Sequence, residues 1–472
     1  MRLLLVALVV EAFLIVASQT DIPASDPLAY AENAYAIERD PQAAFAHPPN
    51  HPFAMRIGLT VPLAGVYRVL GVNGYTTDLI PLLAALAIIC AVFFAVPAGR
   101  ARQFALLFGV TATLLVRQGS VLGVDVLCTA LLAWSLLLLA KGRLSGAMAL
   151  WFAAFLVKES AIWIAPAWAY ALYVDSQKVG WRTAVRAYVP ALAVGLALAG
   201  LYLWFCAWAW GDPLARFAGV QELANEHRWS LGGKGAGVRL HRLTWGPPLL
   251  LVTTFGAVVL LAPFGPRHLP RPERTWVVAT LSVVLLFWFG SAGTSTFEPL
   301  PLLPRMLLPA LPGIVVLAAV AAERYARRPL AIAAVVAAAV VPCAFAVVPG
   351  LFPARPETAA YAALRADVAR GGPVVLVCGD VRCPSITNFH FGFAPPASLT
   401  IVYAADFAPV PGARVRALVN RPRTCYLEQA YRADYGEQDR TQMIEALHLP
   451  ALWTSRDVTL YDAGDGAALH AK

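Results

Sequence analysis

The stretch SDPLAYAENA, residues 25–34, follows the first apolar segment and opens a long polar connection that runs to residue 75. It would place the carboxylate of Asp26 within a turn or two of a membrane surface. Beyond the connection, apolar runs alternate with short charged loops up to about residue 350. We therefore expect Asp26 to lie at a membrane surface, where a reaction centre could use it.

The composition is that of a polytopic membrane protein. Of 472 residues, 59% are hydrophobic and 14% are charged, whereas soluble chains are roughly 45–50% apolar. The net charge of +9 does not indicate nucleic-acid binding, because the basic residues sit in short clusters beside apolar runs and form no continuous basic face. The short basic clusters are better explained as signals that orient the chain in a bilayer.

Eleven apolar runs are candidate membrane spans. Several are shorter than the ~20 residues that cross a bilayer perpendicularly, so we expect helices that are buried in a bundle or stop early at a cavity. The first run could instead be a secretory signal peptide, but Glu11 within it favours a membrane anchor. The runs are 3–17, 76–97, 103–116, 121–140, 146–157, 161–174, 187–210, 247–264, 275–290, 305–322 and 329–348.

Basic clusters occur at every second loop, as the positive-inside rule requires of cytoplasmic loops. This predicts an N-terminus inside, a C-terminus outside, and large outer connections at 20–75, 211–246 and beyond 350. The predicted fold is a polytopic α-helical membrane module, 1–350, followed by a small extracytoplasmic α/β domain, 351–472. We expect a bacterial inner membrane protein.

The two largest outer parts have recognisable local patterns. In the first loop, 26–38 and 53–70 read as helices lying on the membrane. After residue 353 the composition becomes that of a soluble domain, with a helix at 357–370 and strands at 373–378, 414–419 and 458–461. Cys378 and Cys383 could pair with one another or either with Cys425, and free thiols are the alternative.

Ionisable residues at the outer ends of the spans carry the functional signal. Arg and Lys residues in short outer loops oppose the positive-inside bias. The interpretation that explains all of them together is that they bind an anion. At the outer face, that anion would be the phosphate of a polyprenyl lipid, since nucleotide sugars are cytoplasmic. The candidates are Asp26, Arg56, Arg117, Asp125, Lys158, Glu159, Glu298 and Arg305.

A lipid-phosphate donor suggests glycosyl transfer. A phosphate leaves as a weak base, so the reaction needs a base for the acceptor and cations for the phosphate, but no general acid. One carboxylate and a few Lys or Arg side chains would suffice. Direct displacement by the acceptor would invert the anomeric centre.

Several short motifs then resemble the GT-C superfamily, in its protein O-mannosyltransferase and aminoarabinose transferase branch, over about residues 1–350. The resemblance implies that Asp26 is the catalytic base, that Asp125 and Lys158 border one cavity, and that Arg305 lies near the donor phosphate. Pro27 replaces the second acid that many relatives carry, unless Glu32 takes that role. The motifs are SDPLAYAENA (25–34), MRIGLTVPLAGVYRVLG (55–71), VDVLCTALLAW (124–134), FLVKESAIWIAPAW (155–168) and PRMLLPALPGIVVLAA (304–319).

Each candidate also has a purely structural interpretation. Asp26 could cap a helix, Asp125 could pair with Arg117, and Lys158, Glu159 and Arg305 could be interfacial residues. No motif supports a metal or other cofactor, and a helix presenting His47 and His51 together is excluded by Pro48 and Pro49. Basic residues of 211–246 could bind an anion or form a solvated loop.

Two other classes of function compete with transfer. A transporter or flippase of lipid-linked glycans would also be polytopic, but no internal repeat is visible, and apart from Glu11 the charges collect at the outer surface. A non-catalytic scaffold that binds envelope components would give Asp26, Lys158 and Arg305 no common role. Membrane lipids and a polyprenyl-phosphate sugar are the expected partners. The sugar is not specified, and the acceptor could be a protein hydroxyl, lipid A, a polysaccharide or another lipid-linked glycan.

Overall fold

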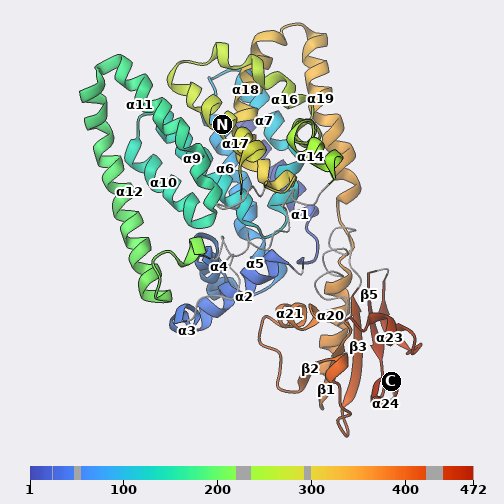
Figure 1. Cartoon of the computed structure of the whole chain (residues 1–472). Helices are drawn as coiled ribbons and strands as arrows, with labels where there is room; N and C mark the ends of the chain where they lie inside the picture. Colours follow the sequence, from blue (N-terminus) through green and yellow to red (C-terminus); the bar gives the residue numbers. More distant parts are fainter. Residues whose placement is uncertain are drawn as a thin grey trace. The chain divides into compact units, whose positions relative to one another are not determined.

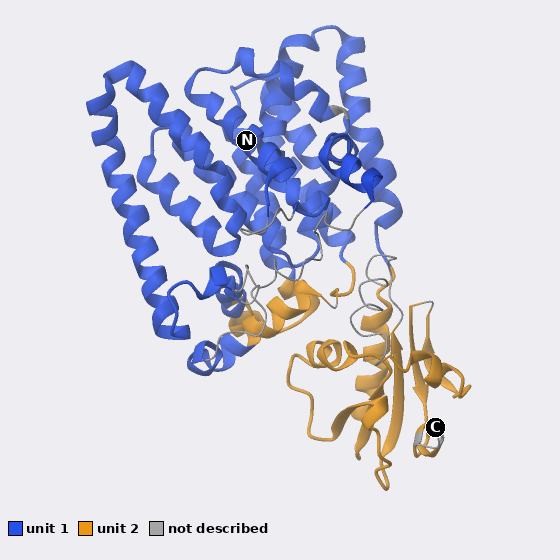
Figure 2. Ribbon diagram, in the orientation of Figure 1, with its two compact units in different colours: residues 1–19, 36–65, 78–353 blue, residues 20–35, 66–77, 354–472 orange. Residues whose placement is uncertain are grey.

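The computed structural model describes residues 1–23, 25–46, 55–218, 235–291, 299–420, 439–455 and 457–470. They form two compact units, coloured separately in Figure 2. Unit 1 comprises 1–19, 36–65 and 78–353, and unit 2 comprises 20–35, 66–77 and 354–472. Two segments of the first loop thus belong to the same compact unit as the C-terminal part. The division into a membrane module and an outer domain stays a prediction.

The secondary structure of the described residues of unit 1 is helical, apart from one isolated bridge between Ser291 and Pro299. Its α-helices are α1 (Arg2–Ala17), α3 (Pro41–Ala46), α6 (Leu79–Ala95), α7 (Arg100–Val110), α8 (Thr113–Gly119), α9 (Val124–Ala140), α10 (Leu144–Val157), α11 (Ala165–Val179), α12 (Trp181–Trp210), α14 (Ala236–Leu243), α15 (Gly246–Phe255), α16 (Ala257–Leu261), α17 (Thr275–Phe289), α18 (Leu311–Tyr325) and α19 (Pro329–Val347). Its 3-10 helices are η2 (Glu159–Ile164), η3 (Ala262–Phe264), η4 (Pro266–His268), η5 (Pro272–Arg274), η6 (Pro304–Ala310) and η7 (Val348–Gly350). Helices α2 (Asp26–Arg39) and α4 (Ile57–Leu70) each contribute to both units.

Every predicted apolar run contains helical structure, but some runs are interrupted. Run 103–116 is divided between α7 and α8, and run 247–264 bends by 108° between α15 and the helical segment that follows it. Among the described residues, five helices are long and apolar enough to cross a membrane, or up to seven if each bent pair is one span. The count of eleven spans stays a prediction.

The helices differ in how they bury their apolar side chains. Every residue of α18 from Leu311 to Ala322 is buried, so this helix forms the core of unit 1. By contrast, α12 and α19 leave most of their apolar surface exposed and lie on the outside of the bundle in Figure 1. Apolar surface of this kind is stable when lipid covers it.

A buried arginine holds the end of α17. Arg242 donates hydrogen bonds to the carbonyls of Phe287 (2.9 Å), Trp288 (3.0 Å) and Leu300 (2.9 Å). The carbonyls at the end of a helix lack partners within the helix, and the guanidinium supplies them. This basic residue of the 211–246 connection therefore has a structural role.

Unit 2 contains a five-stranded sheet in the order β2-β1-β3-β5-β4 (Figure 1). Strands β1 and β2 are parallel, as are β1 and β3, whereas β5 is antiparallel to β3 and to β4. The predicted strands and the helix at 357–370 are present in this unit. Its elements are α5 (Gly74–Thr77), α20 (Pro356–Val368), β1 (Val374–Cys378), α21 (Cys383–His390), β2 (Leu399–Tyr403), η8 (Ala404–Asp406), β3 (Arg414–Asn420), α23 (Thr441–Glu445), β4 (Ala451–Thr454), β5 (Val458–Asp462) and α24 (Ala467–His470).

Side chains of the first loop tie it to the C-terminal part of unit 2. The buried carboxylate of Asp21 accepts backbone hydrogen bonds from Glu357 (2.9 Å) and Thr358 (3.2 Å), in the first turn of α20. An acidic group here satisfies backbone N–H groups and the positive end of the helix dipole. Tyr35 also packs on Phe393, with ring centroids 5.1 Å apart. These contacts explain why residues 20–35 cluster with the C-terminal part.

Candidate functional site

Charged side chains from four parts of the chain gather within unit 1. Asp125 lies in the first turn of α9, and Lys158 and Glu159 lie where α10 ends and η2 begins. Lys158 Nζ forms an ion pair with Asp125 Oδ1. The side chains of Asp125 and Lys158 are 4% and 13% exposed, so water screens this pair little.

Glu159 is held between two arginines. Arg56, directly before α4, places Nη2 3.2 Å from Glu159 Oε2, and Arg216, after α12, places Nε 2.8 Å from Oε1. Burial acts to raise the pKa of Glu159, but the two guanidinium charges outweigh it and lower this pKa to about 2. Glu159 is therefore ionised at neutral pH.

Local backbone geometry brings these groups together. Lys158 has an extended backbone (φ −151°, ψ 137°) that ends α10, so Lys158 and Glu159 follow it in the connection to α11. Near the start of α4, Gly58 packs against the end of α10: a Cβ there would lie 2.7 Å from backbone atoms of Leu156 and Val157. The missing side chain allows α4 to approach closely enough for Arg56 to reach Glu159.

The charge cluster, defined as Arg56, Asp125, Lys158, Glu159 and Arg216, contains three cations and two anions, a balance of +1. Arg216 is 1% exposed, and its Nη2 has no hydrogen-bond acceptor within the described part of the chain. Its guanidinium also lies 5.0 Å from the centroid of the Phe155 ring. A largely buried cluster with excess positive charge and such a donor is suited to an anion.

Arg216 is the residue that the sequence did not single out. It lies in the 211–246 connection, which matches no motif, and its partner Glu159 is 57 positions away. The one available signal was its place among the basic residues of that connection. Arg239 and Arg242 lie in the same connection, so composition alone could not distinguish Arg216 from these two residues.

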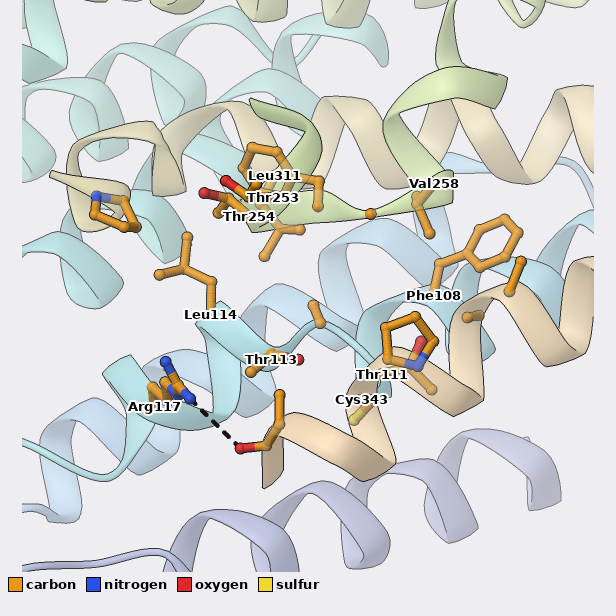
Figure 3. Close-up of a pocket in the computed structure, with 18 residues that line it drawn as sticks. Phe108, Thr111, Thr113, Leu114, Arg117, Thr253, Thr254, Val258, Leu311 and Cys343 are labelled. Carbon is orange, nitrogen blue, oxygen red and sulfur yellow. Dashed lines mark hydrogen bonds between the residues drawn. The ribbon is translucent and has the colours of Figure 1, made fainter. Parts of the chain in front are cut away.

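Arg117 lies in a different environment from the charge cluster. It is on α8, donates to the carbonyl of Ala346 (3.4 Å), and lines a cavity of about 250 Å³ together with threonines such as Thr113 and Thr253 (Figure 3). None of the five charge-cluster residues lines this cavity. The alternative pairing of Asp125 with Arg117 is therefore wrong, because Asp125 pairs with Lys158.

The remaining candidates lie elsewhere. Asp26 is the first residue of α2 and is half-buried. The carbonyl of Ser25 accepts the hydrogen bond from Ala29 N–H (3.2 Å), so Ser25, not Asp26, occupies the position before the helix. Asp26 belongs to unit 2. Arg305 is an exposed residue of η6, and Glu298 lies outside the described residues.

Metal binding has no support in the described ranges, where no three His, Cys, Asp or Glu side chains form a group that could hold an ion. His47 and His51 lie outside these ranges. Metal dependence, which the sequence left open, is therefore untested.

The fold resembles that of a solved protein over nearly the whole chain. It is ArnT-like: the crystal structure of ArnT from Cupriavidus metallidurans in the apo state matches with a TM-score of 0.60, 14% identity and 97% coverage of both chains. The structure of the same protein bound to undecaprenyl phosphate matches with a TM-score of 0.56, at the same identity and coverage. No protein-family model matches the sequence, and no curated protein matches it significantly. The similarity therefore establishes that this chain shares the fold of ArnT.

Proposed function

We propose that this chain transfers a sugar from a polyprenyl-phosphate donor to an acceptor hydroxyl at the outer face of the membrane, with inversion of the anomeric centre. The observation that carries the proposal is the largely buried charge cluster, with its excess positive charge and an Nη2 of Arg216 that has no acceptor among the described residues. ArnT, which shares the fold, has been crystallised with undecaprenyl phosphate.

The charge balance fits this donor. A polyprenyl-phosphate sugar is a phosphodiester with one negative charge, and the cluster has a balance of +1. Lys158 and Arg216 would contact the phosphate, while Asp125 and Glu159 hold them in position. Charge-assisted hydrogen bonds to phosphate are roughly twice as strong as neutral ones. Arg305, Arg56 and Arg117 are the further donor-binding candidates, and no role is assigned to Glu298.

Asp26 supplies the base in this proposal. The acceptor oxygen forms a bond to the anomeric carbon, its proton passes to the Asp26 carboxylate, and the bond from that carbon to the phosphate oxygen breaks. The electron pair leaves with polyprenyl phosphate, whose growing charge the cations stabilise. Because one displacement occurs, the product has the opposite anomeric configuration.

The test uses purified protein in proteoliposomes and radiolabelled polyprenyl-phosphate sugars, offered one at a time with envelope extract as the acceptor source. Transfer predicts that label leaves the lipid fraction for a water-soluble or differently anchored product. The proposal fails if no donor is consumed. If labelled donor crosses the bilayer unchanged, the protein is a flippase of lipid-linked glycans.

A further inference from the structure

A second cavity, which we call the sheet-edge cavity, lies wholly within unit 2 and has a volume of about 650 Å³. Small-molecule sites in proteins typically have volumes of roughly 300–1,000 Å³. One side comes from the first loop and the other from the C-terminal part of the unit. Its polar lining residues are Ser25, Glu32, Arg382, Ser385, Tyr403 and Asp406.

The sheet places this cavity at a position that commonly binds ligands. Parallel strands β1 and β2 end at Cys378 and Tyr403, and the cavity is lined by residues that follow these ends. In α/β folds, ligands bind beyond the carboxyl ends of parallel strands. The opposite wall is one face of α2 together with the residue before it, because the lining positions 25, 28, 29 and 32 have helical spacing.

The turn after β1 is fixed by covalent and polar contacts. Cys378 and Cys383 form a disulfide, with Cα atoms 5.6 Å apart. Asp380 Oδ1 accepts hydrogen bonds from the backbone of Arg382 (2.7 Å) and Cys383 (3.1 Å), at the start of α21. This resolves the pairing that the sequence left open. It also gives the cavity a rigid wall.

The chemistry of the lining favours a neutral polyol. Ser25, Ser385 and Tyr403 supply hydroxyls, whereas Glu32 and Asp406 supply carboxylates. The Arg382 guanidinium lies 3.5 Å from Asp380, so its charge is balanced locally. Two carboxylates disfavour an anionic ligand but accept hydrogen bonds from hydroxyls. Tyr403 is 39% exposed, and its hydroxyl donates to the carbonyl of Val381 (3.3 Å), which ties the aromatic ring to the cavity wall.

We propose that the sheet-edge cavity binds a neutral, hydroxyl-rich sugar unit of the acceptor. Sugars present hydroxyls at their edges and C–H groups on their faces, which match the carboxylates and the Tyr403 ring. The assignment rests on the proposed function, because α2 carries both this wall and Asp26 at its first residue. It makes a glycan the acceptor class and disfavours an anionic head group.

The test measures binding of neutral saccharides to the full-length protein in nanodiscs by saturation-transfer NMR. The probes are mono-, di- and trisaccharides of glucose, mannose, galactose and N-acetylglucosamine, with mannose 6-phosphate as an anionic probe. Tyr403→Ala should weaken binding roughly fivefold to tenfold through the lost ring contact. Glu32→Gln should weaken it as well. Glu38→Gln is the matched control, since Glu38 is on α2 but does not line the cavity.

Failure of this inference differs from failure of the proposed function. Absence of neutral saccharide binding to the parent, binding unaffected by Tyr403→Ala, or preference for mannose 6-phosphate would overturn the cavity assignment even if donor is consumed. Saccharide binding that depends on Tyr403, in a protein that consumes no polyprenyl-phosphate sugar, would retain the site and reject the transfer reaction. Undecaprenyl-phosphate binding should be unchanged in both cavity variants.

Discussion

Replacing Lys158 separates the stability of the charge cluster from its use in donor binding. Lys158→Met leaves the carboxylate of Asp125, 4% exposed, without its ion-pair partner. Breaking a buried pair in this way costs about 3–5 kcal/mol, because an uncompensated charge remains. Adding Asp125→Asn removes that charge, so the double variant should recover most of the lost stability. Thermal unfolding in one nanodisc composition measures this.

Donor binding should not recover with stability. If Lys158 contacts the phosphate, both the single and the double variant lose a charge-assisted contact worth ~1.5–3 kcal/mol, which lowers affinity roughly tenfold to a hundredfold. Equilibrium binding of undecaprenyl phosphate to the parent, to Lys158→Met, to Asp125→Asn and to the double variant gives this comparison. A double variant that is stable and binds with parental affinity would refute the role of Lys158 as a phosphate ligand.

The remaining predictions address the donor, the topology and the acid response. Arg305→Ala should weaken undecaprenyl-phosphate binding roughly tenfold. Arg305→Lys should recover only part of the affinity, because Lys restores the charge but not the bidentate guanidinium geometry. Equal affinities of the parent and Arg305→Ala would reject the contact. A single cysteine introduced near Gly142 should be shielded from an impermeant thiol reagent in intact cells and one near Gly235 labelled, and the reverse pattern would invert the topology. Burial lowers the pKa of His390 to about 4 from 6.5, so unit 2 should lose up to about 3 kcal/mol as pH falls between these values, since the unfolded chain takes up the proton first. His390→Gln should flatten this pH dependence in hydrogen exchange of β1, and an unchanged slope would contradict it.

The sequence located the helices well because apolar runs must be helical in a bilayer, where backbone groups have no water to bind. It located the breaks poorly. The 103–116 run reads as continuous, yet α7 ends at Val110 and α8 begins at Thr113. Such breaks depend on packing against other helices, which hydropathy does not encode.

The candidate site was predictable in its residue types but not in its pairings. Asp125, Lys158 and Glu159 were recognised from their positions at helix ends, and the structure brings Asp125 and Lys158 together. The partners of Glu159 are 103 and 57 positions away, and no local rule connects them. The inclusion of residues 20–35 in unit 2 was missed for the same reason, since Asp21 meets α20 more than 330 positions later.

The proposed roles of the two units are tested most directly by Asp26→Asn in single-turnover transfer from a radiolabelled polyprenyl-phosphate sugar. Asn keeps the shape of the side chain but is no longer a base. We predict a fall in the transfer rate of ~10²-fold or more, with undecaprenyl-phosphate affinity and thermal stability close to the parent. Transfer by the variant at more than about a tenth of the parental rate would contradict Asp26 as the general base.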